Sequence, residues 1–239
     1  MEVVSNIKVL DLCLYLEDEK ILVVSDVHMG YEEALNKGGV LIPRHQFRET
    51  MERLKKTLTF VKPETIILNG DVKHEFGTIS ETEWRHTIKL IDYLAKHCKK
   101  LVLLRGNHDK SLGPIAKKRN IEMMDEFLVG DTLISHGDHV PDVATLKDVK
   151  TIIIGHEHPA VSISDYPRVE KFKCFLVGKW KRKNLVVMPS YNLVTEGTDV
   201  VSDRLLSPFL DGNLDKFRVV IVSDSVYDFG TLKDVKKLC

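Results

Sequence analysis

Short apolar runs of strand length recur along the whole chain. They are rich in leucine and β-branched residues, as strands buried on both faces of a sheet usually are. The runs are Ile21–Ser25, Thr65–Leu68, Leu101–Leu104, Thr132–Ile134, Thr151–Ile154, Cys174–Val177, Leu185–Met188 and Val219–Val222. Between some of them, Glu49–Phe60 and Glu81–Lys96 carry apolar residues at helical spacing, and Ser80 precedes the second as a candidate N-cap. The pattern therefore predicts an α/β protein.

The order of these elements predicts two packed sheets covered by helices. Strands alternate with helices in the first half, whereas strands joined by short turns dominate the second half. Ile7–Leu16 is expected to form a strand that ends in a turn over residues 17–20. Residues 199–213 mix charges with a proline and a glycine, which favours a long surface loop near the site. No repeat or linker divides the chain, so residues 1–239 are expected to form a single domain.

The composition and the N-terminal segment narrow the class of protein. No apolar run reaches the roughly 18 residues that cross a membrane, so we expect no membrane contact. The first residues contain neither a basic region nor an apolar signal segment, and we therefore expect a cytoplasmic protein. The four cysteines lie far apart without a CxxC motif, which argues against a disulfide framework and against a zinc ribbon.

The charge balance does not indicate a nucleic-acid partner. The chain has 35 basic and 35 acidic residues, whereas a dedicated nucleic-acid binder usually shows a clear basic excess. The strongest basic run is Lys179–Lys183 around Trp180. We interpret it as a solvated turn between two strands, with contact to a phosphate backbone as the alternative. Nothing in the sequence selects an oligomeric state.

Five of the apolar runs stop abruptly in acidic, amide or histidine side chains. In open α/β sheets, functional groups gather beyond the carboxyl ends of the strands, so we expect these side chains to share one small volume. They are Asp26, His28, Asp71, Asn107, His108, His136, His156 and His158. Because unpaired buried charges are costly, coordination of cations is the expected reason for the gathering. Oxygen and nitrogen ligands without cysteine favour Mn²⁺, Fe or Zn²⁺ over a thiolate site.

Two of these clusters repeat the spacing of one ligand, any residue, then a second ligand. In an extended segment, residues two apart point the same way, so Asp26 and His28 are expected to face one ion. His156 and His158 repeat that spacing after another strand. A single such pair is usually a pair of surface residues, but an ordered set after five apolar runs predicts a metal centre.

In this order the motifs resemble the signature of the calcineurin-like metallophosphoesterases. That signature is Asp-x-His, Gly-Asp, Gly-Asn-His-Asp/Glu, a lone His and Gly-His-x-His. The corresponding residues are Asp26-Val27-His28, Gly70-Asp71, Gly106-Asn107-His108-Asp109, His136 and Gly155-His156-Glu157-His158. The resemblance runs from about residue 21 to residue 158. It implies a four-layer αββα sandwich of two mixed β-sheets flanked by helices, with a dinuclear metal site on one edge.

The resemblance also implies a role for each motif residue. The implied ligands of the first metal are Asp26, His28 and His158. Those of the second metal are Asn107, His136 and His156, with Asp71 as the bridge between the two metals. His108 matches a catalytic histidine that binds no metal, and Asp109 is expected to orient it. The implied cofactors are two divalent ions per chain, in the first place Mn²⁺, with Ni²⁺, Zn²⁺ or Fe as alternatives.

The resemblance implies hydrolysis of a phosphate ester by a hydroxide that bridges the metals, with His108 assisting the leaving alkoxide. Two stretches, Asp26–Leu35 and Asn69–Phe76, resemble the small archaeal phosphoesterases related to the Mre11/SbcD nucleases. They also resemble the phosphodiesterases associated with bacterial DNA ligases. The favoured function is therefore a phosphodiesterase for small or nucleotide-like diesters. The alternatives are an Mre11/SbcD-like DNA or RNA nuclease and a non-catalytic scaffold of the same fold.

Two further residues are candidates for contact with the substrate. His74 stands three residues after the Gly-Asp motif, where purple acid phosphatases have a metal-binding tyrosine. It is expected either to contact phosphate or to make a structural hydrogen bond. Arg44 lies in the loop after the first helix, where a guanidinium can bind a phosphate oxygen. The alternative for Arg44 is an exposed loop arginine without a role in the site.

Overall fold

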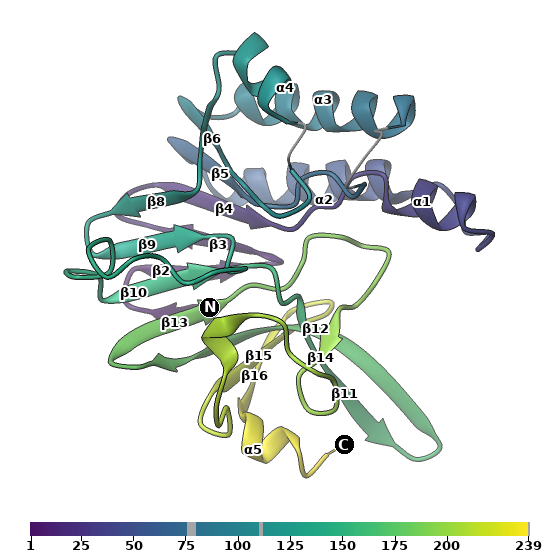
Figure 1. Ribbon diagram of the computed structural model, residues 1–239. Helices are drawn as coiled ribbons and strands as arrows, with labels where there is room; N and C mark the ends of the chain where they lie inside the picture. Colours follow the sequence, from purple (N-terminus) through teal and green to yellow (C-terminus); the bar gives the residue numbers. More distant parts are fainter. Residues whose placement is uncertain (76–79, 110–111, 239) are drawn as a thin grey trace.

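Two β-sheets pack face to face, and helices lie on their outer sides (Figure 1). The computed structural model describes residues 1–75, 80–109 and 112–238, so Phe76 of the Asn69–Phe76 stretch lies outside the described residues. The sheets and helices confirm the predicted αββα layers. The outer layer of the second sheet is thin, because it consists of one short helix and an irregular segment.

The first sheet follows the order of the chain. Its described strands are β1 (Glu2–Val4), β2 (Ile7–Leu10), β3 (Cys13–Leu16), β4 (Ile21–Ser25), β5 (Thr65–Asn69), β6 (Lys100–Leu104) and β7 (Glu122–Met124). Neighbours are antiparallel from β1 to β4 and parallel from β4 to β7. Parallel strands need crossover connections. The helices in these connections are α1 (Tyr31–Lys37), α2 (Gln46–Phe60), α3 (Glu81–Ala95) and α4 (Gly113–Lys118).

The second sheet is built from the later part of the chain. Its described strands are β8 (Glu126–Val129), β9 (Thr132–Ser135), β10 (Thr151–Ile154), β11 (Pro159–Asp165), β12 (Arg168–Trp180), β13 (Lys183–Val187), β14 (Thr198–Asp199), β15 (Arg218–Val222) and β16 (Val226–Thr231). Strand β10 lies parallel to β9 and to β13. A 3₁₀ helix at Pro208–Leu210 and helix α5 (Leu232–Val235) complete the described helices. None of the helices within the described ranges is long and apolar enough to cross a membrane.

The apolar core joins the two sheets. One cluster of buried side chains includes Val23 and Ile67 of the first sheet together with Ile153 and Phe175 of the second, all with no exposed surface. These side chains lie on strands that the sequence predicted to be buried on both faces. Because β4, β5 and β6 run parallel in register, as do β9 and β10, the carboxyl ends of the strands in each sheet lie at one edge.

Three sequence expectations need correction. Ile7–Leu16 is not one strand but the hairpin of β2 and β3, because Asp11 turns the chain with a φ of 58°. Residues 199–213 are more than a surface loop, since Phe209 is 2% exposed and packs into a second apolar cluster. Helix α2 begins three residues earlier than expected, at Gln46. The cap of α3 is confirmed, because Ser80 Oγ accepts a hydrogen bond from the Glu83 N–H at 3.1 Å.

Candidate metal centre

The predicted ligands follow strands that end at the same edges. Strands β4, β5 and β6 are parallel and in register, so the segments after them leave the first sheet together. Strands β9 and β10 of the second sheet also end in register. A direct contact joins the two edges, because the His156 N–H donates to Asp26 Oδ2 at 3.1 Å. The packing of the sheets thus brings residues from five strand ends into one site.

The turns that carry the ligands are left-handed, and the expectation of extended segments is wrong. The backbone φ is 54° at Asp26 and 47° at His28, and it is 64° at His156 and 52° at His158. Residues other than glycine seldom adopt this conformation, which costs about 1–3 kcal/mol each. His156 and His158 also join different ligand groups. The fold therefore holds these turns against a local preference for other backbone conformations.

The first ligand group consists of Asp26, His28 and His158. Their donor atoms all lie within 4.8 Å of one another. His158 Nε2 is 3.3 Å from His28 Nε2 and 3.3 Å from Asp26 Oδ1. Asp26 is completely buried, and its Oδ1 has no hydrogen-bond partner in the described part of the chain. A buried carboxylate oxygen that faces imidazole nitrogens without a hydrogen bond fits a cation ligand.

The second ligand group consists of Asp71, His136 and His156, and Asn107 lies beside it. The carboxylate and imidazole donor atoms again lie within 4.8 Å of one another. His136 Nε2 is 3.0 Å from Asn107 Oδ1 and 3.2 Å from His156 Nδ1. Oxygen and nitrogen atoms at these separations make a donor set that suits Mn²⁺, Fe or Zn²⁺.

One oxygen of Asp71 lies between the two groups. Asp71 Oδ2 is 3.7 Å from His28 Nε2 in the first group and 3.5 Å from His136 Nε2 in the second. The other oxygen, Oδ1, accepts the N–H of His108 at 2.9 Å, which fixes the carboxylate. This placement is what the bridging role implied by the sequence resemblance requires.

The protonation states of the site suit cation binding. Burial lowers the pKa of His28 and of His136, so both rings are neutral at pH 7 and offer a lone pair. Burial would raise the pKa of Asp26, but the neighbouring histidines, His158 first, lower it below its ordinary range. Burial, followed by the Asp26 charge, raises the pKa of Asp71. Two buried carboxylates this close need positive charge if both are to be ionised, and divalent cations supply it.

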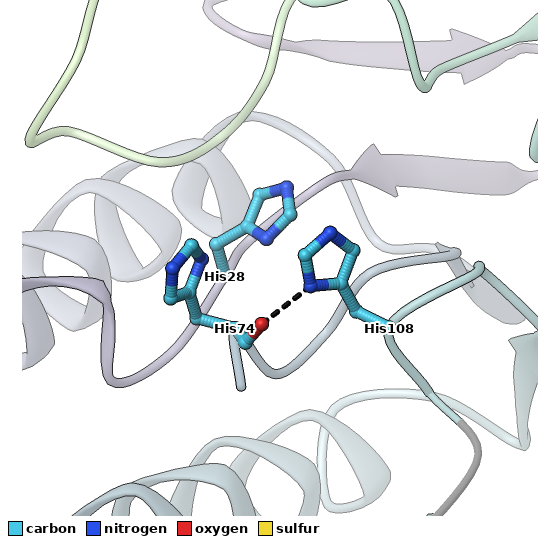
Figure 2. A group of neighbouring side chains, drawn as sticks. All are labelled: His28, His74 and His108. Carbon is cyan, nitrogen blue, oxygen red and sulfur yellow. Dashed lines mark hydrogen bonds between the residues drawn. The ribbon is translucent and has the colours of Figure 1, made fainter. Parts of the chain in front are cut away.

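The ring of His108 lies beside the rings of His28 and His74 (Figure 2). The His108 Nδ1 contacts the main-chain carbonyl of His74, and His108 Nε2 is 3.7 Å from Asp71 Oδ2. The carbonyl is an acceptor, so Nδ1 carries a proton and Nε2 is the nitrogen at which the ring would gain or lose a second one. His28, His74 and His108 form a further set of donors within 4.8 Å. The His74 ring also packs on Tyr31, with ring centroids 4.3 Å apart.

Asp109 supports the turns and accepts hydrogen bonds from main-chain groups. Its carboxylate accepts the N–H of Val72 at 3.1 Å, of Gly106 at 3.2 Å and of Lys73 at 3.4 Å. Burial raises the pKa of Asp109 to about 7. These contacts tie the Gly-Asp turn to the Gly-Asn-His-Asp turn. The group that contacts Nδ1 of His108 is the His74 carbonyl, where the sequence suggested Asp109.

Arg44 lies on the surface next to α1. Its guanidinium is paired with Glu33 at 3.0 Å, and its side chain is 63% exposed. This contact matches the alternative of an exposed loop arginine.

Two supporting residues, Gln46 and Glu157, were missed by the sequence analysis. Gln46 is 3% exposed, and its Nε2 donates to the carbonyls of His28 (2.8 Å) and Val27 (3.2 Å). Glu157, between the two histidines of its motif, accepts the N–H groups of Leu206 (2.7 Å) and Ser207 (2.8 Å). These bonds attach the 199–213 segment to the back of the ligand turns. The available signal for Glu157 was its position inside the motif, whereas Gln46 resembles any polar residue at a helix start.

The structure can be compared with those of known proteins. The structure is similar to that of the nuclease MPE from Pseudomonas putida, with a TM-score of 0.65, 19% identity and coverage of 92% of both chains. It is less similar to YfcE, a phosphoesterase from E. coli, with a TM-score of 0.42, 12% identity and coverage of 88% of this chain and 98% of that one. A comparison with curated proteins gives no match. At these identities the likeness concerns the fold alone.

The sequence itself matches a family description over most of its length. Residues 19–178 match the calcineurin-like phosphoesterase family, and this range contains every predicted metal ligand. The two sheets and the His/Asp groups at their common edge agree with that match. The chain belongs to the calcineurin-like phosphoesterase family.

Proposed function

We propose that this protein is a metal-dependent phosphodiesterase that hydrolyses small or nucleotide-like phosphodiesters. The observation that carries the proposal is the position of Asp71 Oδ2, 3.7 Å from His28 Nε2 and 3.5 Å from His136 Nε2. A carboxylate between two groups of imidazoles suits a dinuclear centre better than a single ion. Family membership supports the hydrolysis of phosphate esters as the reaction class.

The proposed ligands follow the two groups. Asp26, His28 and His158 would hold one divalent ion, and Asn107, His136 and His156 would hold the other, with Asp71 shared. Mn²⁺ is the proposed native ion, because the ligands are oxygen and imidazole nitrogen without thiolate. Bound in this way, two cations polarise the phosphoryl group and make water a better nucleophile at neutral pH.

His108 is the proposed proton donor to the leaving oxygen. Its Nδ1 is held by the His74 carbonyl, so the imidazolium form of His108 would donate its second proton from Nε2, on the side of Asp71. Positioned proton transfer of this kind contributes typically about 10²–10⁴-fold to rate. His74 lies with its ring 5.6 Å from that of His108, close enough to share contact with a phosphate. The presence of His108 beside complete ligand groups favours an enzyme over a scaffold.

The test compares diester and monoester hydrolysis in the same protein. Bis(4-nitrophenyl) phosphate and 4-nitrophenyl phosphate are assayed with and without added Mn²⁺, Ni²⁺ or Zn²⁺. We expect metal-dependent turnover that is faster on the diester. His108→Ala at equal metal loading is expected to lose about 10²-fold or more, and His97→Ala, at an exposed histidine after α3, is the matched control. No turnover of either ester with any of the metals contradicts the proposal.

A nuclease is the second candidate, because the similar P. putida protein is a nuclease and shares its fold over 92% of both chains. The net charge of zero gives this chain no general attraction to a polyanion. Single-stranded DNA in the same assay separates the two functions. Cleavage of the polymer at a rate above that of the chromogenic diester would favour the nuclease.

A further inference from the structure

A buried carboxylate outside the metal centre holds the turn that carries His74. Glu83 is completely buried in the first turn of α3. Its Oε1 accepts hydrogen bonds from the N–H of His74 at 2.9 Å and from the N–H of Glu75 at 3.0 Å. The backbone of Glu83 is itself anchored, because its N–H donates to the capping Ser80. Helix α3 thus presents one fixed acceptor to two adjacent main-chain donors.

The surroundings of Glu83 leave little space for another arrangement. A Cβ placed on Gly30 would lie only 2.7 Å from Glu83 Cγ, so the segment that follows the Asp-x-His motif packs directly against this side chain. The His74 N–H also contacts the Met29 carbonyl at 3.0 Å. The segment after His28 therefore packs against the Glu83 side chain, and the turn at His74 donates hydrogen bonds to its carboxylate.

We propose that Glu83 is a positioning residue for His108, an inference that rests on the proposed function. The relay consists of two contacts, from Glu83 to the main chain at His74 and from the His74 carbonyl to His108 Nδ1. With Nδ1 held, Nε2 points to the side of Asp71. A displaced turn would misdirect the proton that the imidazolium form donates from Nε2, whereas the side-chain and capping hydrogen bonds of Glu83 in the described part of the chain go to His74, Glu75 and Ser80 and to none of the seven proposed metal ligands. Glu83 should consequently affect leaving-group protonation more than metal binding.

The test uses the dependence of rate on the leaving group. Bis(4-nitrophenyl) phosphate releases a weakly basic phenolate that needs little protonation, whereas diphenyl phosphate releases a more basic one that needs a proton donor. We expect Glu83→Ala to lower kcat on diphenyl phosphate on the order of tenfold more than on the nitrophenyl diester, with KM and bound metal unchanged. Glu83→Gln keeps a carbonyl acceptor at Oε1 and is expected to restore wild-type behaviour. Glu81→Ala removes an exposed carboxylate from the same helical turn and is the matched control.

A second measurement reports on the turn at His74 and does not depend on catalytic activity. Hydrogen exchange of the His74 and Glu75 amides is expected to be faster in Glu83→Ala than in the wild-type protein and in Glu83→Gln. Where Glu83→Ala is too unstable to purify, Glu83→Asp withdraws the acceptor by one methylene and serves the same comparison. If Glu83→Ala lowers kcat equally on both diesters, or on neither, the positioning role is wrong and the proposed function is unaffected. An inactive wild-type protein overturns the proposed function, and this role with it.

Discussion

Replacing Gly155 by alanine tests the metal centre with a single methyl group. A Cβ at this position would lie 2.0 Å from Ser25 Oγ and 2.2 Å from Asp26 Oδ2. Both neighbours are completely buried, so neither side chain has solvent into which it can turn. Gly155 follows β10, and its φ is not in the left-handed region. The backbone conformation at this position is therefore one that alanine can adopt. The effect of the substitution is therefore steric and falls on a proposed ligand.

The size of the effect follows from these distances. Ordinary contact begins at 3.4 Å, so the Asp26 carboxylate has to retreat by about 1 Å or the backbone of β10 has to shift by a similar amount. Overpacking of this kind costs about 1–3 kcal/mol of folding free energy. Metal–ligand distances tolerate deviations of only about 0.2 Å. The first metal should then lose at least about 10–100-fold in affinity, as it does when ligand-supporting groups are removed.

Calorimetric titration of Mn²⁺ into chelator-treated protein measures this loss directly. The wild-type protein should bind two ions. Gly155→Ala should bind one of them with wild-type affinity, whereas its affinity for the other should fall by at least about tenfold. The melting temperature of the metal-free variant should fall by roughly 2–12 °C. Gly113→Ala is the control, because a Cβ there meets no atom within 4 Å. Two ions bound to Gly155→Ala with wild-type affinity would refute the placement of Asp26 in the site.

Further substitutions test other parts of the site. Asp71→Asn should lower the affinity for both ions and abolish turnover, because one carboxylate oxygen lies close to both ligand groups. Loss of affinity for a single ion in the titration would contradict a shared ligand. Gln46→Ala should destabilise the protein by about 1–3 kcal/mol in chemical denaturation, since the carbonyl of Val27 loses its Gln46 donor and that of His28 keeps only the Tyr31 N–H at 3.2 Å; an unchanged midpoint would show that water replaces the lost donor. Burial, followed by His108, lowers the pKa of His74 from 6.5 to about 4, so between these values the unfolded chain binds a proton that the folded chain does not. The metal-free protein should therefore lose stability from pH 6.5 down to pH 4, and His74→Gln should show a shallower loss; equal slopes would refute this assignment.

The sequence alone was sufficient to predict the core of the sheets and the gathering of the motif residues in one small volume. Strand β4 and strand β10 begin and end at the predicted residues, because four consecutive apolar residues in β4 and three in β10 need burial on both faces. Polar residues directly after such strands lie at the edge where the strands end. For that reason the five motifs converge as predicted, although they are spread over 133 positions of the chain, from residue 26 to residue 158.

The tertiary structure decided how each ligand is held and which residues support it. The local spacing of Asp26 and His28 suggested an extended segment, but contacts to distant carbonyls and N–H groups maintain left-handed turns there. Gln46 has no local signature, and Glu83 matches only the last residue of a Ser-x-x-Glu helix start, so the sequence does not show that these side chains face the turns at His28 and His74. Hydrogen bonds between segments far apart in sequence depend on how the sheets and helices pack, and no local pattern encodes that packing.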